Sequence, residues 1–183
     1  MKSLKGMSIL VTGGGSGIGL GTARYCIERG AKVTICGRRE DKIQAAATEL
    51  GDACCGVAAD ITQAAERQKL LEAALDHGGQ LDALINNAGN MYRGAITELD
   101  ETALQEVFHT NVIAAMMLTG LCTPSLALQQ GAVVFVGSIH TRRAFPGASS
   151  YAATKAAVQG LTRVLAAELG EQKIRVNCLL PGA

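Results

Sequence analysis

Short apolar runs alternate with amphipathic segments along most of the chain. Several of these runs are apolar throughout rather than alternating with polar residues, which is typical of strands covered on both faces. The pattern predicts six strands: Ser8–Val11, Lys32–Cys36, Cys54–Ala58, Ala83–Asn86, Ala132–Val136 and Arg175–Leu179. A helical pattern lies between successive pairs, so we expect an α/β fold built on a parallel sheet.

The segments between the strands have a helical spacing of apolar residues, and glycines that can end helices follow four of them. We expect the helices Gly17–Glu28, Asp41–Leu50, Ala64–His77, Glu101–Leu118 and Tyr151–Leu169. The longest uncharged stretch, Val112–Leu128, contains Gly120 and Pro124 and falls short of the ~20 residues that a membrane span needs. We therefore interpret it as a buried helix.

The composition indicates one compact, soluble domain over residues 1–183, with 48% hydrophobic residues, 18% charged residues and 22 glycines. A net charge of +1, with basic residues spread along the chain, gives no reason to expect nucleic acid as a partner. The six cysteines lie mostly in apolar segments without metal-ligand spacing, so we expect reduced thiols and no metal site. The first apolar run is too short for a signal peptide, and a cytoplasmic protein is expected.

A glycine cluster, residues 12–19 with the sequence TGGGSGIG, follows the first strand and precedes the first helix. A strand, a glycine turn and a helix in this order form a typical phosphate-binding element. The spacing is Gly13-x-x-x-Gly17-x-Gly19 rather than G-x-G-x-x-G. We expect Gly13 to allow a tight turn, Gly17 to let the backbone approach a pyrophosphate, and Gly19 to let the helix pack on the strand.

Gly37 follows the second predicted strand, at the place where a fold that binds NAD usually has a carboxylate for the ribose 2′-hydroxyl. Arg38 and Arg39 follow it and can bind a 2′-phosphate through their planar guanidinium groups. The alternative is a solvated basic pair at a helix N-terminus. The residues favour NADP over NAD as the cofactor.

Tyr151 and Lys155 stand four residues apart on an expected helix, and Ser138 lies thirteen residues before the tyrosine. Positions four apart share one face of a helix, so the ammonium can favour the ionised form of the phenol. When hydride reaches a carbonyl carbon, negative charge develops on the oxygen, which two hydroxyl donors can stabilise. One of these donors must also give up a proton.

These motifs, in this order, resemble the short-chain dehydrogenase/reductase family from Met7 to the end of the chain. The resemblance adds Asp60, matching an aspartate at the adenine ring, and residues 86–89 (NNAG), matching a motif that borders the cofactor. For Asp60 alone, a helix N-cap is an equal alternative. The fold implied is a Rossmann-like, doubly wound sheet in the order 3-2-1-4-5-6. The cofactor-binding residues implied are Thr12, Gly13, Gly15, Ser16, Gly17, Ile18, Gly19, Arg38, Arg39, Asp60, Ile61, Asn87, Ala88, Gly89, Tyr151, Lys155, Pro181 and Gly182.

The resemblance also implies a catalytic tetrad of Asn111, Ser138, Tyr151 and Lys155. In it Tyr151 is the general acid/base, Lys155 lowers its pKa and binds the nicotinamide ribose, and Ser138 orients a substrate carbonyl. The expected function is NADP-dependent reduction of a small-molecule carbonyl or oxidation of a secondary alcohol; a non-catalytic nucleotide-binding or scaffold protein is the alternative. Four residues are expected to border the substrate pocket, Met91, Tyr92, His140 and Phe145, although His140 is equally interpreted as a solvent-facing loop residue. Arg142 and Arg143 either form a solvated pair or steer an anionic substrate.

The last residues of the sequence match the end of the family's sixth strand. The family continues with a substrate-covering loop, a further helix and a seventh strand, so a domain without the last helix and strand is expected. Apolar residues on Glu101–Leu118 and Tyr151–Leu169 exceed what one core-facing stripe requires, and the family pairs these helices between subunits. We expect a homodimer through these helices, or a homotetramer if a further segment supplies the family's second contact.

Overall fold

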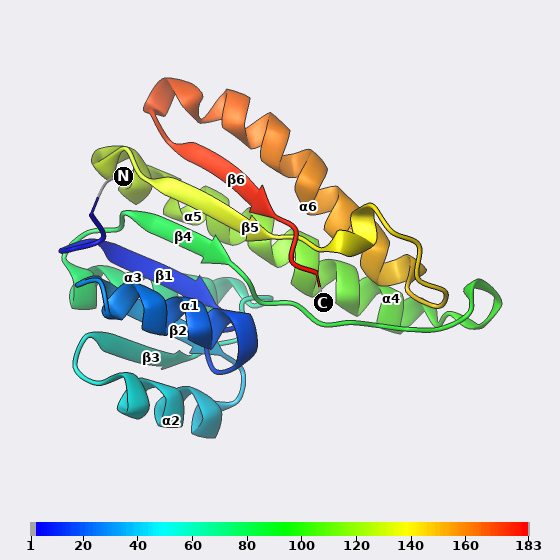
Figure 1. Cartoon of the computed structure of the whole chain (residues 1–183), viewed down its shortest axis with the longest axis horizontal. Coiled ribbons are helices and arrows are strands. Elements are labelled where there is room, and N and C mark those ends of the chain that lie inside the picture. Colours follow the sequence, from blue (N-terminus) through cyan, green and yellow to red (C-terminus); the bar gives the residue numbers. More distant parts are fainter. Residues whose placement is uncertain (1–2, 183) are drawn as a thin grey trace.

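A computed structural model of the protein describes residues 3–182. Its centre is a six-stranded sheet in the order β3-β2-β1-β4-β5-β6, and all neighbouring strands are parallel (Figure 1). This confirms the doubly wound order predicted from the sequence. The strands are β1 (Ser8–Thr12), β2 (Lys32–Gly37), β3 (Cys54–Ala58), β4 (Ala83–Asn86), β5 (Ala132–Val136) and β6 (Arg175–Leu179).

The helices lie between the strands and agree with the predicted segments to within two residues at most ends. They are α1 (Gly17–Ile27), α2 (Glu40–Leu50), α3 (Ala64–Gly78), α4 (Glu101–Phe108), α5 (Ala114–Gln129) and α6 (Ser149–Glu168). A π-helical turn, His109–Ile113, joins α4 to α5. Three 3-10 turns were not predicted: Ile96–Glu98, Ile139–Thr141 and Gly170–Gln172.

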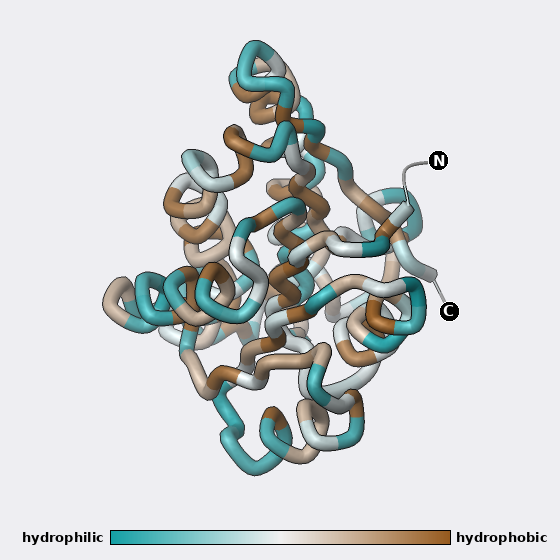
Figure 2. Tube along the Cα trace, turned by 90° about the vertical axis from the view of Figure 1, so that its left-hand side faces the viewer, coloured by the Kyte–Doolittle hydropathy of each residue, from teal (hydrophilic) through white to brown (hydrophobic). Residues whose placement is uncertain are grey.

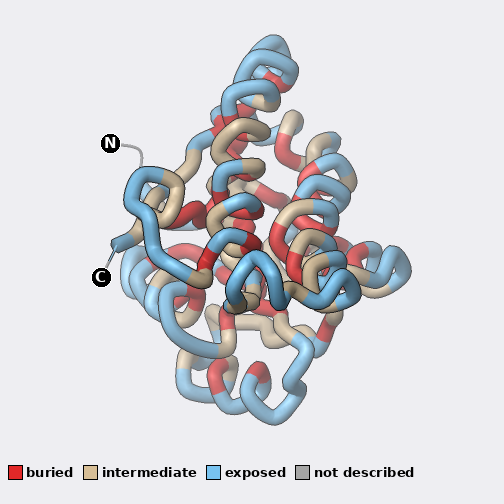
Figure 3. The backbone as a smooth tube through the Cα atoms, turned by 90° about the vertical axis from the view of Figure 1, so that its right-hand side faces the viewer, coloured by how far each residue is buried: buried red, intermediate tan, exposed pale blue. Residues whose placement is uncertain are grey.

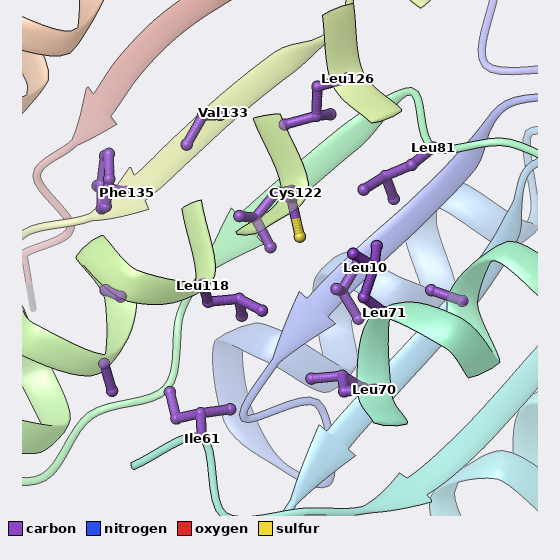
Figure 4. Packing of buried hydrophobic residues seen from close by; sticks show 14 of the residues in the cluster. Leu10, Ile61, Leu70, Leu71, Leu81, Leu118, Cys122, Leu126, Val133 and Phe135 are labelled. Carbon is purple, nitrogen blue, oxygen red and sulfur yellow. The ribbon is translucent and has the colours of Figure 1, made fainter. Parts of the chain in front are cut away.

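Two hydrophobic cores lie on opposite faces of the sheet. On one face α1 and α2 pack against β1, β2 and β3, and on the other α3, α5 and α6 cover the sheet from β3 to β6. Figure 4 shows part of the larger core, where Leu118 and Cys122 of α5 lie near Leu10 of β1 and Leu71 of α3. Figures 2 and 3 show hydrophobic and buried positions concentrated in the interior, with hydrophilic and exposed ones on the outer loops.

The expectation that several strands are covered on both faces is confirmed for β1 and most of β2, whereas β6 differs from them. All five residues of β1 are buried, whereas in β6 the exposed Arg175, Asn177 and Leu179 alternate with Val176 and Cys178. The reason is that α6 covers only the face of β6 that carries Val176. The edge strand β6 is therefore covered on one face only.

The end predicted at Leu118 for the fourth helix was wrong, whereas the helix expected over Val112–Leu128 is present as α5. The helical segment continues through Pro124 to Gln129, and its total of 29 residues is long and apolar enough to cross a membrane by length and composition. A core helix of a soluble protein passes the same test, and Leu118, Cys122 and Leu126 are fully buried against the sheet and α3. A proline inside a helix costs about 3 kcal/mol. Burial of these three side chains, at roughly 1.5–3 kcal/mol for each large apolar one, outweighs that cost.

Candidate active site

The candidate site lies at the edge of the sheet where the strands end. Because all six strands are parallel, the residues that follow β1, β2, β4, β5 and β6 meet at this edge. Two adjoining pockets of about 400 and 380 Å³ lie there and share Ile18, Asn87, Gly89 and Asn90. We call the larger one the first pocket and the other the second pocket, and together they form one continuous cleft.

The glycine turn between β1 and α1 forms one wall of the first pocket. Gly13 has a φ of +66°, and a Cβ there would come within 2.9 Å of the Cα of Ala88. A Cβ on Gly19 would collide with the carbonyl oxygen of Gly13, so this glycine is needed for the helix to pack on the turn. Gly17 has a φ of +54° and open space around it. Gly13 and Gly19 therefore occupy the kinds of position expected from the sequence, whereas the approach of a pyrophosphate to Gly17 stays a prediction.

Side-chain hydrogen bonds tie this turn to the end of β4. The Oγ1 of Thr12 accepts hydrogen bonds from the backbone N–H groups of Asn87 and Ala88, at 3.0 and 2.9 Å. In return the Nδ2 of Asn87 donates to the carbonyl oxygens of Thr12 and Gly13, at 2.9 and 3.1 Å. The glycine turn that forms a wall of the first pocket is thus hydrogen-bonded to Asn87, which lines both pockets.

The first pocket presents features that fit an anionic dinucleotide. Among the residues that the structure describes, no side chain caps the N-terminus of α1, and the first turn of α1 carries no acidic residue. Its backbone N–H groups are consequently available to a phosphate, which the helix dipole also favours. Gly15, Ser16 and Ile18 line the pocket at this helix end, and the described chain gives this helix end no anion of its own.

Basic residues gather where β2 ends at the rim of the first pocket. Arg38 and Arg39 line it and are exposed, and neither forms an ion pair with another residue in the range 3–182. Lys42, from the first turn of α2, also lines the pocket. Sequence reasoning missed this lysine, because only the packing of α2 beside the pocket brings Lys42 to the rim.

Asp60 and Ile61 form the opposite side of the first pocket. The carboxylate of Asp60 accepts hydrogen bonds from the backbone N–H and the hydroxyl of Thr62, at 3.0 and 2.8 Å. The residue at the N-cap of α3 is Gln63, so the alternative interpretation of Asp60 as that helix cap was wrong. Asp60 instead stabilises the turn that closes this side of the pocket.

The second pocket brings together Ser138, Tyr151 and Lys155. Ser138 follows β5, and Tyr151 and Lys155 lie in the first two turns of α6. The Nζ of Lys155 lies 5.5 Å from the centre of the Tyr151 ring, as the spacing of four residues predicted. Pro181 and Gly182, which follow β6, also line this pocket.

Lys155 is almost fully buried, with 5% of its surface exposed, and its Nζ donates a hydrogen bond to the carbonyl oxygen of Val136 at 2.7 Å. Burial lowers the pKa of this ammonium, and the nearby Cys178 opposes the shift. The folded protein therefore holds the lysine proton less tightly than the unfolded chain, and protonation disfavours folding as the pH falls below the usual lysine range. A buried, destabilising charge beside a pocket is typical of a functional site.

Asn111 lies in the π-helical turn, behind the cleft rather than in its lining. Its Nδ2 donates to the carbonyl oxygen of Asn90 and to the hydroxyl of Thr154, at 2.9 and 3.1 Å, and its Oδ1 accepts from the N–H of Asn90 at 2.9 Å. Asn111 thus holds Asn90, which lines both pockets, against α6. A π-helical turn often marks a functional position, and this one was not predicted.

The remaining expected residues divide between the cleft and its surroundings. Met91 and His140 line the second pocket, whereas Tyr92 and Phe145 line neither pocket. The hydroxyl of Tyr92 instead accepts a hydrogen bond from the N–H of Asp100. Arg142 and Arg143 are exposed and lie outside both linings. Thr12, Gly17 and Gly19 support the glycine turn without lining either pocket.

Comparisons with known proteins agree with this geometry. A family model described as short chain dehydrogenase matches residues 7–183. An uncharacterised oxidoreductase of Methylorubrum extorquens is 33% identical over 100% of this chain and 75% of its own length. Dehydrogenase/reductase SDR family member 4 of Sus scrofa is also 33% identical, over 99% of this chain and 67% of its own length.

The fold is shared with solved structures of the same class. The crystal structure of 3-ketoacyl-(acyl-carrier-protein) reductase from Brucella melitensis, complexed with NADH, has a TM-score of 0.95 and 34% identity, and the match covers 98% of this chain and 76% of that one. The chain belongs to the short-chain dehydrogenase family, whose members named here are oxidoreductases. It spans roughly two thirds to three quarters of the length of these relatives.

Two buried threonines on neighbouring strands provide a test of the link between β1 and β4. Thr12→Val removes the acceptor of the Ala88 N–H, and we expect the free energy of unfolding to fall by about 1–3 kcal/mol. Thr34→Val is the matched control, because the hydroxyl of Thr34 is equally buried but has no hydrogen-bond partner among residues 3–182. This control should leave stability unchanged or raise it. Urea unfolding of both variants makes the measurement, and equal losses would contradict a special role for Thr12.

Proposed function

We propose that this protein is an NADP(H)-dependent oxidoreductase that interconverts a carbonyl compound and a secondary alcohol, with Tyr151 as the general acid/base. One observation carries the proposal. Ser138, Tyr151 and Lys155 line a single pocket that opens onto the cleft beside the glycine turn. A substrate in the second pocket would therefore lie next to a dinucleotide bound along the first.

The side chains of the second pocket suit the chemistry of a carbonyl oxygen. A bound nicotinamide dinucleotide supplies or accepts the hydride. The hydroxyls of Ser138 and Tyr151 donate hydrogen bonds to the substrate oxygen, where negative charge develops as the carbonyl is reduced. Tyr151 then gives its proton to this oxygen, and in the reverse direction the phenolate takes the proton from the alcohol.

Lys155 has two tasks in this proposal. Its ammonium lies one helical turn from Tyr151 and stabilises the phenolate electrostatically. The hydrogen bond to Val136 uses one of its three N–H donors, which leaves donors for a ribose hydroxyl at the junction of the two pockets. The carbonyl of Val136 at the end of β5 thus sets the position of the ammonium.

A preference for NADP(H) is proposed from the rim of the first pocket. Gly37 offers no carboxylate to a ribose 2′-hydroxyl, and Arg38, Arg39 and Lys42 place three positive charges around the same spot. The related Brucella melitensis structure holds NADH, which supports a nicotinamide dinucleotide in general. The choice of NADP(H) rests on the basic residues of this chain.

The catalytic proposal is tested by Tyr151→Phe, which keeps the ring and removes the acidic hydroxyl. We expect turnover of NADPH with a responsive carbonyl substrate to fall by a factor of about 10³ or more, because the proton donor is lost. Calorimetric affinity for NADPH should change little. Tyr25→Phe is the control, since Tyr25 lies on α1 outside both pocket linings, and it should retain full activity. A Tyr151→Phe protein with near-normal kcat would show that another group transfers the proton.

A panel of carbonyl compounds, including 3-oxoacyl thioesters, sugars, steroids and small ketones, separates this function from its alternative. NADPH binding without turnover of any panel member would favour a non-catalytic nucleotide-binding or scaffold protein.

The cofactor preference is tested by Arg38→Ala. The unmutated protein should bind NADPH more tightly than NADH, and the variant should lose most of that advantage, by roughly 1–3 kcal/mol, because a charge-assisted hydrogen bond to the 2′-phosphate is gone. Affinity for NADH should stay nearly constant. Arg175→Ala, an exposed arginine of β6 outside both pocket linings, is the control for net charge. Tighter binding of NADH than of NADPH by the unmutated protein would refute the preference.

We also propose a homodimer through α4, α5 and α6. Ile113, Met116, Met117 and Val164 are 44–54% exposed, which is unusual for four large apolar residues on adjoining helices. Other apolar residues of these helices, such as Val107 and Val158, are buried and belong to the core.

A charge introduced at the exposed apolar surface tests the dimer. Met117→Glu should convert the dimer to a monomer in light scattering, because a carboxylate would be buried in the contact. Ile96→Glu, at an exposed apolar residue of the turn before α4, should remain dimeric. A monomeric unmutated protein would refute the proposal.

A further inference from the structure

The loop after β5 contains a histidine that contacts two residues of the proposed catalytic group. The Nδ1 of His140 lies 3.0 Å from the Oγ of Ser138, and the ring of His140 meets the ring of Tyr151 edge to face, with centroids 5.2 Å apart. His140 also lines the second pocket. It is therefore not the solvent-facing loop histidine that was the alternative interpretation of the sequence.

The orientation of the His140 ring is fixed from several sides. Phe145 stacks on one face of the imidazole, with centroids 4.1 Å apart and planes inclined by 28°. Tyr151 contacts the ring at right angles, with an interplanar angle of 88°. The backbone N–H of His140 donates to the Oγ of Ser138 at 3.2 Å. A ring held in this way presents Nδ1 to Ser138 in one geometry, which is how a supporting residue fixes a reactive group.

The direction of the hydrogen bond between Ser138 and His140 decides what the serine can do. If Nδ1 is bare, the Ser138 hydroxyl donates to it, and that proton is turned away from a substrate. If Nδ1 carries the proton, the Oγ accepts from both the ring and the backbone N–H of His140. The serine proton is then free to point into the second pocket.

The other ring nitrogen favours the second arrangement. The Nε2 of His140 is buried and has no hydrogen-bond partner among residues 3–182. In protein backbones, buried N–H groups without a partner are rarer than acceptors that lack a donor. A bare Nε2 is therefore less costly here than a protonated one, and a neutral imidazole with a bare Nε2 carries its proton on Nδ1.

We propose that His140 is a positioning residue that holds Ser138 as a double hydrogen-bond acceptor, so that the serine hydroxyl donates to the substrate oxygen. This inference rests on the proposed function for its catalytic consequence, but the hydrogen-bond arrangement itself can be measured without turnover. Phe145, which lines neither pocket, acquires a role in it by holding the His140 ring in place.

The arrangement is tested first by ¹⁵N NMR of the histidine side chains in the free protein. The chain has three histidines, and the spectrum of His140→Phe assigns the signals of residue 140. We expect a proton on Nδ1 and a bare Nε2. A neutral ring with its proton on Nε2 would overturn the inference, whether or not the protein turns over a carbonyl compound.

The catalytic consequence is tested by a double-mutant cycle. His140→Phe keeps an aromatic ring between Phe145 and Tyr151 but removes Nδ1, and kcat should fall about tenfold, the effect of losing roughly one hydrogen bond near a developing charge. KM should change by less than about twofold. His140→Asn places an amide near the position of Nδ1 and should recover most of the loss. His77→Phe, on the distant end of α3, is the matched control and should not alter kcat.

His140→Phe and His140→Asn are then each combined with Ser138→Ala. In that background His140→Phe should change kcat by less than about twofold, because its effect passes through the serine. An equal loss in both backgrounds would overturn the inference and show that His140 acts on substrate or on Tyr151 directly. Absence of turnover by the unmutated protein with every carbonyl compound would count against the proposed function alone, since the NMR result would still decide how His140 and Ser138 are bonded.

Discussion

The reciprocal hydrogen bonds between Thr12 and Asn87 join the ends of β1 and β4, and the shape of the cleft depends on them. They lie at the point where the strand order reverses, so the connections that leave β1 and β4 diverge to opposite faces of the sheet. Without this link the glycine turn and the residues 87–90 could separate. With it, the same asparagine fixes the turn of the first pocket and lines the second.

A second buried polar network holds the catalytic end of the cleft. Asn111 joins the backbone of Asn90 to Thr154 of α6, and Lys155, the next residue, reaches across to the carbonyl of Val136. Buried polar groups are costly unless they are paired, so such a network specifies one arrangement of the helices and strands that carry it. It fixes α6 against the ends of β4 and β5 and thereby sets where Tyr151 lies.

The two ends of the cleft differ in their electrostatics. The first pocket is bordered by exposed arginines and a lysine that water screens, which suits a charged group that stays partly solvated. In the second pocket the single ammonium is buried, and its pKa is lowered by that burial. Interactions with charge that develops on a substrate oxygen are therefore stronger there than at the rim. The proposed binding of the dinucleotide and the proposed proton transfer therefore take place at different ends of one cleft.

The resemblance to the family implied the sheet order and several residues of the cleft. The sequence by itself determined the strands, the glycine turn and the other expected cleft residues. These depend on local patterns: apolar runs for the strands, positive φ at Gly13 and Gly17, and a spacing of four residues that places Tyr151 and Lys155 on one helical face. Arg38 and Arg39 were also found, because they directly follow a strand whose end could be predicted.

Only the tertiary structure showed what stabilises α5 across Pro124, and it alone decided the π-helical turn at Asn111, the approach of Lys42 and the contact of His140 with Ser138. Each depends on neighbours that are distant in the sequence or on backbone geometry that no residue type requires. Packing against the sheet outweighs the local preference of a proline, and the ring of His140 takes its orientation from Phe145 and from Tyr151 of another helix. Local patterns and the motifs of the family therefore indicated most of the residues that reach the cleft, and long-range packing specified how they face one another.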